Sequence, residues 1–122
     1  MHDDIVARLA SLGYAVTDDD EWLIKYEADK VTELIKAECN LSALPLGLYQ
    51  VAVDMVCGEL LQLKKGLGAL EDFDLEYAVK RISEGDTSVE YAVGDGAVTF
   101  DEFIRRMTDR RGVFASFRKL RW

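Results

Sequence analysis

The feature that most constrains the fold is a long, broadly apolar segment at residues 46–65. On a helical projection of this segment, only a narrow ribbon around Gln50, Asp54 and Gln62 is polar. This pattern is typical of a central helix that other elements cover on several sides. One glycine, Gly58, lies inside it. Because a mid-helix glycine costs about 1 kcal/mol relative to alanine, we expect another helix to pack closely there.

Two amphipathic helices are predicted before this segment. Residues 4–12 place apolar side chains three and four apart and then meet Gly13, which suits a helix that ends in a left-handed residue. Thr17 precedes a run of acidic residues that favours a second helix start, and Asn40 is the expected end of that helix. Its apolar stripe has helical spacing and consists of Ile24, Ala28, Val31, Ile35 and Cys39.

Two more helices are predicted after the central one. Asp74 begins a shorter helix, and Thr99 with Glu102 has the spacing of a capping box that begins the last one. Gly112 is the expected stop of that last helix. The predicted fold is therefore mainly α, a small bundle of about five helices with one short strand or hairpin and an extended C-terminal arm.

The strand is expected between residues 87 and 93, where the apolar period changes to two. Val89, Tyr91 and Val93 would share one face of it. The following turn at residues 94–96 leaves too little chain for a full return strand before the last helix. Because bare two-stranded pairs are marginal in water, we expect this strand to pair with another chain.

Charge is distributed unevenly along the chain. The net charge is −8, but residues 105–122 hold seven basic residues and one acidic residue, a net of +6. The other residues hold 8 basic and 22 acidic residues, a net of −14. Complementary potentials of this kind steer association, so self-association or binding of another acidic protein is expected.

Length and composition indicate a single domain of 122 residues. No segment approaches the roughly 20 apolar residues of a membrane span, and the acidic start at Asp3 and Asp4 does not fit a secretory signal. We therefore expect a cytoplasmic protein with no membrane partner. Cys39 and Cys57 lie in helical patterns among apolar neighbours, which predicts reduced core thiols.

A partial match to a calcium-binding loop fails when it is tested ligand by ligand. If Gly96 is the sixth residue of an EF-hand loop and Glu102 the twelfth, the first, third and fifth positions fall on Tyr91, Val93 and Asp95. Two of these three side chains lack a carboxylate or amide oxygen. A turn followed by a capped helix explains the segment better.

Catalytic signals are weak. His2 is the only histidine and lies at a terminus, a position that is usually mobile. Neither cysteine has a sequence-near base, and no glycine-rich phosphate loop is present. We therefore predict no enzyme activity, no catalytic residues, no metal and no cofactor.

The last ten residues are predicted to dock onto a partner, which divides the chain into a helical domain at 1–112 and an arm at 113–122. Trp and Arg are favoured at interface hot spots. The expected docking residues are Phe114, Phe117, Arg118, Lys119, Leu120, Arg121 and Trp122. Packing onto the chain's own domain, a nucleic-acid arm and free disorder remain as alternatives.

Several stretches together resemble the head-tail connector proteins of tailed phages, in order and spacing over nearly the whole chain. They are Leu12-Gly13-Tyr14, Val53-Asp54-Met55-Val56-Cys57-Gly58-Glu59, Glu84-Gly85-Asp86-Thr87 and Phe117-Arg118-Lys119-Leu120-Arg121-Trp122. The resemblance implies a helical adaptor in the virion neck, assembled in the host cytoplasm as a ring of about twelve copies below the portal. Its implied partners are the portal protein, the next neck or tail-completion protein, and DNA passing through the channel without sequence-specific binding.

The alternative function is a small nucleic-acid-binding or regulatory module that uses the Arg-rich C-terminal end. Salt-sensitive DNA binding by the isolated protein would distinguish it from a connector.

Overall fold

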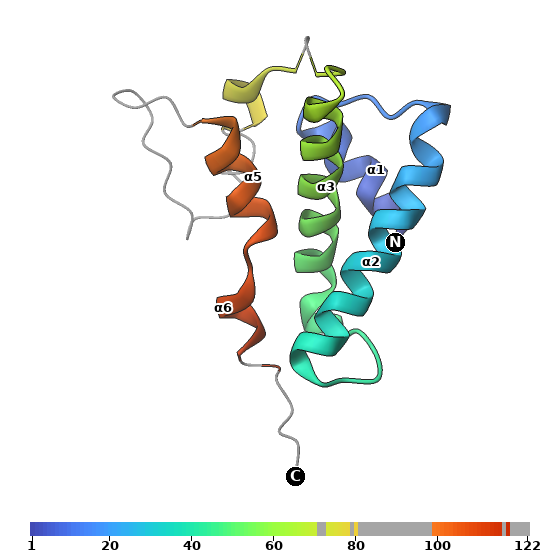
Figure 1. The fold of residues 1–122 in the computed structure, drawn as a ribbon, viewed down its shortest axis with the longest axis vertical. Helices are drawn as coiled ribbons and strands as arrows, with labels where there is room; N and C mark the ends of the chain where they lie inside the picture. Colours follow the sequence, from blue (N-terminus) through green and yellow to red (C-terminus); the bar gives the residue numbers. More distant parts are fainter. Residues whose placement is uncertain (71–72, 79, 81–98, 116, 118–122) are drawn as a thin grey trace.

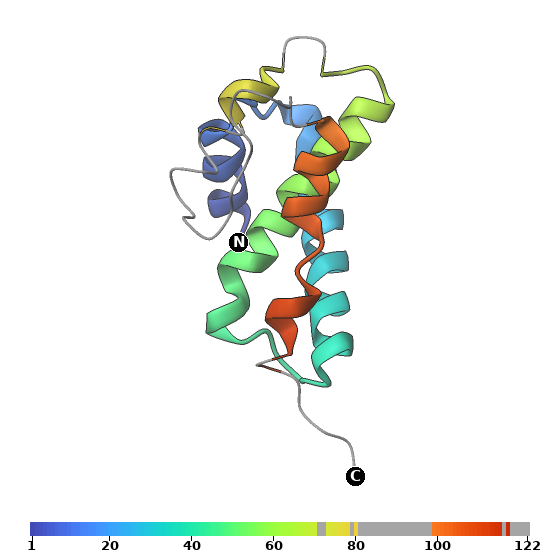
Figure 2. The same cartoon turned by 90° about the vertical axis from the view of Figure 1, so that its left-hand side faces the viewer.

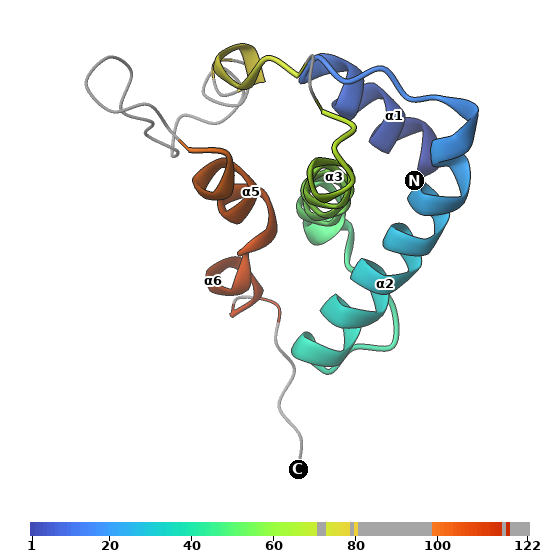
Figure 3. The same ribbon diagram turned by 45° about the horizontal axis from the view of Figure 1, so that its top comes forward.

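The computed structural model describes residues 1–70, 73–78, 80, 99–115 and 117. In this part of the chain, α3 (Tyr49–Gly66) is the central helix. Helices α1 (His2–Ser11) and α2 (Glu21–Cys39) lie on one side of it, and α5 (Phe100–Thr108) lies on the other (Figures 1 and 3). The short helix α6 (Arg111–Phe114) follows α5 and packs against α2. The predicted mainly helical bundle is confirmed.

The ends of the first two helices follow local sequence signals. Gly13 has a φ of +92° after α1, which confirms the predicted left-handed end of that helix. Asn40 ends α2 as predicted, and its φ of 55° is left-handed as well. Thr17 and Asp20 form a capping box around a single 3-10 turn, η1 (Asp18–Asp20), which leads directly into α2.

Most of the predicted stripe of α2 faces the core. Ile24, Val31 and Ile35 are at most 2% exposed, and Cys39 is fully buried, whereas Ala28 is only partly buried. Glu27 is buried as well, which the apolar pattern did not predict. Its carboxylate lies 3.0 Å from Lys30 Nζ, so the buried charge has a partner on the same helix.

Helix α3 and α5 pack closely at Gly58, as the sequence predicted. A Cβ atom added to Gly58 would lie 2.7 Å from Thr108 Cγ2 and 2.9 Å from Met107 Cβ. No real side chain tolerates such distances without a shift of its neighbours. The helix-weakening glycine is therefore explained by the approach of α5.

Only parts of the segment between α3 and α5 belong to the described residues. Residues 75–78 are helical, in agreement with the predicted shorter helix, and Ala78 is fully buried. Val89, Tyr91 and Val93, the expected intersubunit strand, lie outside the described residues. Thr99 caps α5, since its Oγ1 accepts a hydrogen bond from Glu102 N at 3.2 Å, which confirms the capped helix expected there.

The prediction that no segment approaches the length and apolar composition of a membrane span was wrong. Residues 46–66 are long and apolar enough, with a mean hydropathy of 1.2, to span a membrane by length and composition. In the structure α3 instead packs against α1, α2 and α5, and eight of its residues are buried within the bundle. Core helices covered on several sides meet the same criterion as membrane spans, because both are apolar nearly all round.

Candidate docking surfaces

The start of the predicted C-terminal arm packs onto its own domain. Phe114 is 1% exposed, and its carbonyl oxygen lies 3.8 Å from the Cys39 thiol at the end of α2. Phe117 lies against Gly47, where an added Cβ atom would come within 2.7 Å of the ring. Figure 2 shows that α6 and the loop between α2 and α3 lie at the same end of the molecule.

These contacts correct the predicted arm. Gly112 lies inside α6 rather than at a domain boundary, so the division between 1–112 and 113–122 does not match the packing. Phe114 is a core residue and Phe117 is partly buried. Their packing lowers the free energy of the folded chain, because apolar rings are removed from water. Arg118, Lys119, Leu120, Arg121 and Trp122 lie outside the described residues.

One basic residue of the C-terminal region is held by the domain itself. Asp54 on α3 accepts hydrogen bonds from Arg8 Nε at 2.8 Å and from Arg110 Nη2 at 3.3 Å. This ion cluster joins α1, α3 and the junction between α5 and α6. Asp54 was expected on a water-facing ribbon, but its side chain is only 18% exposed, because arginines distant in sequence converge on it.

A second ion cluster fixes the start of α2. Asp20 is fully buried, and its carboxylate receives a hydrogen bond from the Tyr14 hydroxyl at 2.7 Å and another from Thr17 N at 3.1 Å. Lys64 Nζ lies 2.5 Å from its other oxygen. Burial acts to raise the pKa of Asp20, but these donors and the lysine charge outweigh it and lower the pKa below 3.8.

The outer surface of α2 carries an exposed aromatic pair. Trp22 is 69% exposed and Tyr26 is 52% exposed. Their rings are stacked, with centroids 5.5 Å apart and planes 10° from parallel. Sequence reasoning missed this pair, although two aromatic residues four apart on the polar face of an amphipathic helix were a usable signal.

Beside Trp22 lies a hollow between the start of α1 and the first half of α2. Its lining residues are His2, Glu21, Trp22, Ile24, Lys25, Ala28 and Asp29. His2 Nε2 lies 2.5 Å from Glu21 Oε2, and His2 Nδ1 lies 3.1 Å from Asp3 Oδ1. These two carboxylates raise the pKa of His2 above 6.5, Asp3 most of all. His2, which was expected to be mobile, therefore lines the hollow and contacts Asp3 and Glu21.

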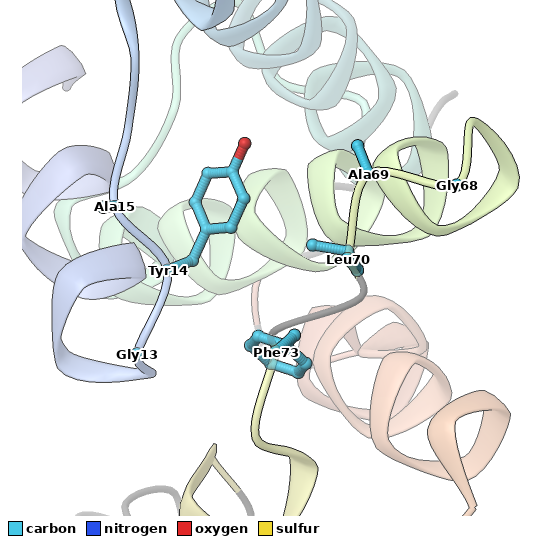
Figure 4. A pocket seen from close by; sticks show the side chains of 7 residues that line it. All are labelled: Gly13, Tyr14, Ala15, Gly68, Ala69, Leu70 and Phe73. Carbon is cyan, nitrogen blue, oxygen red and sulfur yellow. The ribbon is translucent and has the colours of Figure 1, made fainter.

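A second hollow, of about 490 Å³, lies where the ends of α1 and α3 meet (Figure 4). Glycine, alanine, Tyr14, Leu70 and Phe73 line it, and among the described residues none of the lining side chains is charged. The hydroxyl of Tyr14 is already engaged with Asp20. This hollow therefore offers few groups that could fix the orientation of a ligand.

Within the described residues, no three His, Cys, Asp or Glu side chains gather as they would around a metal ion. Cys39 and Cys57 are both buried and free, as predicted. Burial, followed by the nearby charge of Asp54, raises the pKa of Cys57 to about 12, so its thiolate is scarce at neutral pH.

Comparisons with protein-family models, with curated proteins and with solved structures return no match for this chain.

Proposed function

We propose that this protein is a structural head-tail connector of a tailed phage or prophage, which binds below the portal and extends the DNA channel. The observation that carries the proposal is the packing of Phe114 and Phe117 immediately before the basic end of the sequence. Phe114 and Phe117 hold the start of the C-terminal segment at one end of the bundle, and three basic residues, Leu120 and Trp122 follow within five residues. Basic and aromatic residues that follow a packed anchor suit protein docking, because Trp and Arg are favoured at interface hot spots.

The helical bundle and the family resemblance support the same proposal. The connector would act without cofactor or catalysis in the virion neck, after assembly in the host cytoplasm. Its partners would be the portal protein, the next neck or tail-completion protein and copies of itself in a ring. DNA would pass through the channel without sequence-specific contacts, and an acidic body suits that role because it repels the phosphate backbone.

The test is to mix the purified protein with an isolated portal ring and to image both, alone and combined. We expect discrete additional density below the portal. A variant that lacks residues 118–122 should lose it, while Leu67→Ala, which alters a residue 68% exposed on the loop after α3, should retain it.

A protein that ignores the portal would contradict the proposal. If that protein also bound duplex DNA with an affinity that falls steeply with salt, the alternative of a small nucleic-acid-binding or regulatory module would be favoured. The pairing of Arg110 with Asp54 weakens that alternative, because it occupies one of the basic residues such a module would use.

A further inference from the structure

We propose that the hollow beside Trp22 receives residues 118–122 of a second copy of this chain. The inference goes beyond the proposed function, since it requires neither a portal nor a phage. It states which two parts of the protein would join copies to one another.

The walls of the hollow fit a basic, aromatic peptide. Glu21 and Asp29 line it and are exposed, and Asp3 lies next to it through its contact with His2. The three carboxylates of Glu21, Asp29 and Asp3 outnumber the two basic side chains that line the hollow, Lys25 and His2, and His2 already contacts Glu21. The segment 118–122 has Arg118, Lys119 and Arg121 and no acidic residue. Its charge is thus complementary to that of the rim.

The apolar part of the segment also has a matching surface. Trp22 lines the hollow, and its ring stacks on that of Tyr26, which is not among the lining residues, with centroids 5.5 Å apart. A stacked, exposed indole ring offers a preorganised face for another aromatic side chain or for an arginine guanidinium. Leu120 and Trp122 alternate with the basic residues in the segment, so both kinds of contact are available to it.

The geometry favours a second copy over the same chain. Phe117, the residue before the segment, lies against Gly47, in the loop that follows the end of α2 (Figure 2). Trp22 precedes Cys39, the last residue of α2, by 17 residues, which is about 26 Å along a helix. Five fully extended residues span at most about 18 Å. The aromatic pair also lies on the exposed side of α2, whereas α6 packs with its buried Phe114 toward the core. A chain's own segment therefore falls short of its own hollow.

A contact of this kind is head-to-tail, because each copy offers one segment and one hollow at different places. Such heterologous contacts extend from copy to copy and produce rings when the rotation closes. The portal and the neighbouring copy would compete for the same segment. Self-association and portal binding must therefore be measured separately, and failure of one leaves the other standing.

The experiment is a complementation test by sedimentation velocity on the purified full chain. The wild type should associate as its concentration rises. Trp22→Ala impairs the hollow but keeps the segment, and a variant lacking residues 118–122 keeps the hollow but not the segment. Each variant alone should self-associate about tenfold more weakly or worse. Their mixture should form one-to-one heterodimers and nothing larger, because only one intact contact is possible.

Two further variants sharpen the test. Asp29→Lys should weaken association of the full chain, because it reverses a charge at the hollow. Leu67→Ala is the control, because Leu67 is as exposed as Trp22 but does not line the hollow, and this variant should associate like the wild type. Circular dichroism confirms that each variant is folded. A wild type that stays monomeric at every concentration, a mixture that does not form heterodimers, or undiminished association without residues 118–122 would overturn the proposal.

Discussion

At the scale of single residues, acidic side chains that look alike in sequence have very different environments. Asp18 and Asp19 are exposed in the turn η1 just before α2, while Asp20, the next residue, is fully buried. Asp20 differs because the capping turn points its carboxylate toward Tyr14 and Lys64. Local sequence identifies the helix start, but not which of the three aspartates enters the core.

The substitution Asp20→Asn tests how much the buried contact between Asp20 and Lys64 stabilises the fold. At neutral pH we expect it to reduce the free energy of unfolding by about 3 kcal/mol, because Lys64 then remains largely buried without its ionic partner. The folded state lowers the pKa of Asp20 below its ordinary value of 3.8. Its stabilising contribution is therefore complete above pH 3.8 and is lost as the pH falls through the folded pKa.

Urea denaturation of wild type and variant across this pH range measures the effect. The two stabilities should converge in acid. Asp19→Asn, which changes an exposed carboxylate in the same turn, should differ from wild type by no more than about 0.5 kcal/mol. If the difference in free energy of unfolding between wild type and Asp20→Asn did not change with pH, the ionised Asp20 carboxylate would not be the source of the stabilisation.

At the scale of elements, α3 shows how helix pattern and helix packing are related. Its broad apolar surface predicted contacts on several sides, and α1, α2 and α5 provide them. Asp54 shows where the pattern is insufficient. It lies on the polar ribbon, yet two arginines from other elements enclose it, and their positions depend on how the helices cross.

The substitution Gly58→Ala tests the close approach of α5 to α3. The added methyl group would meet Thr108 and Met107 at less than 3 Å, so we expect a loss of about 1–2 kcal/mol in the free energy of unfolding. This loss is net of the helix propensity that alanine gains.

Gly66→Ala is the matched control, because it lies at the end of the same helix with nothing within 4 Å of an added Cβ atom. It should be neutral or stabilising by about 0.5 kcal/mol. Equal stabilisation by both substitutions, measured by thermal denaturation, would show that α5 does not approach α3 this closely.

At the scale of the whole molecule, the C-terminal region has a part that packs onto the bundle and a part to which both proposals assign docking. Phe114 completes the core between α6 and the end of α2, and Phe117 covers Gly47. The five residues after Phe117 carry the docking chemistry of both proposals. Truncation at different points should separate these roles.

Deletion of residues 113–122 should reduce the free energy of unfolding by about 3–5 kcal/mol, because it removes the buried ring of Phe114. Deletion of residues 118–122 should change it by no more than about 0.5 kcal/mol. Denaturant unfolding of both truncated proteins provides the comparison. Equal stability of the two would mean that Phe114 contributes nothing to the core and that the arm does begin at Gly112.

The sequence alone determined the helical elements of this protein and most of their ends. The helix ends are set by residues that interact with the neighbouring backbone, namely Gly13, Asn40 and Thr99. The buried face of α2 follows from the helical spacing of the apolar residues between Ile24 and Cys39. Both signals are local in the sequence. Even Gly58 was interpretable, because a helix-weakening residue in an apolar helix implies a close neighbour.

Only the tertiary structure decided which side chains meet across the bundle. The partners of Asp20 and Asp54, the burial of Phe114 and the hollow beside Trp22 all depend on residues far apart in the chain. Their distances follow from helix crossing and loop path, which periodicity does not encode. For the same reason, a segment composed like a membrane span became the covered centre of the bundle, and the predicted ten-residue arm became an anchored turn with five residues beyond it.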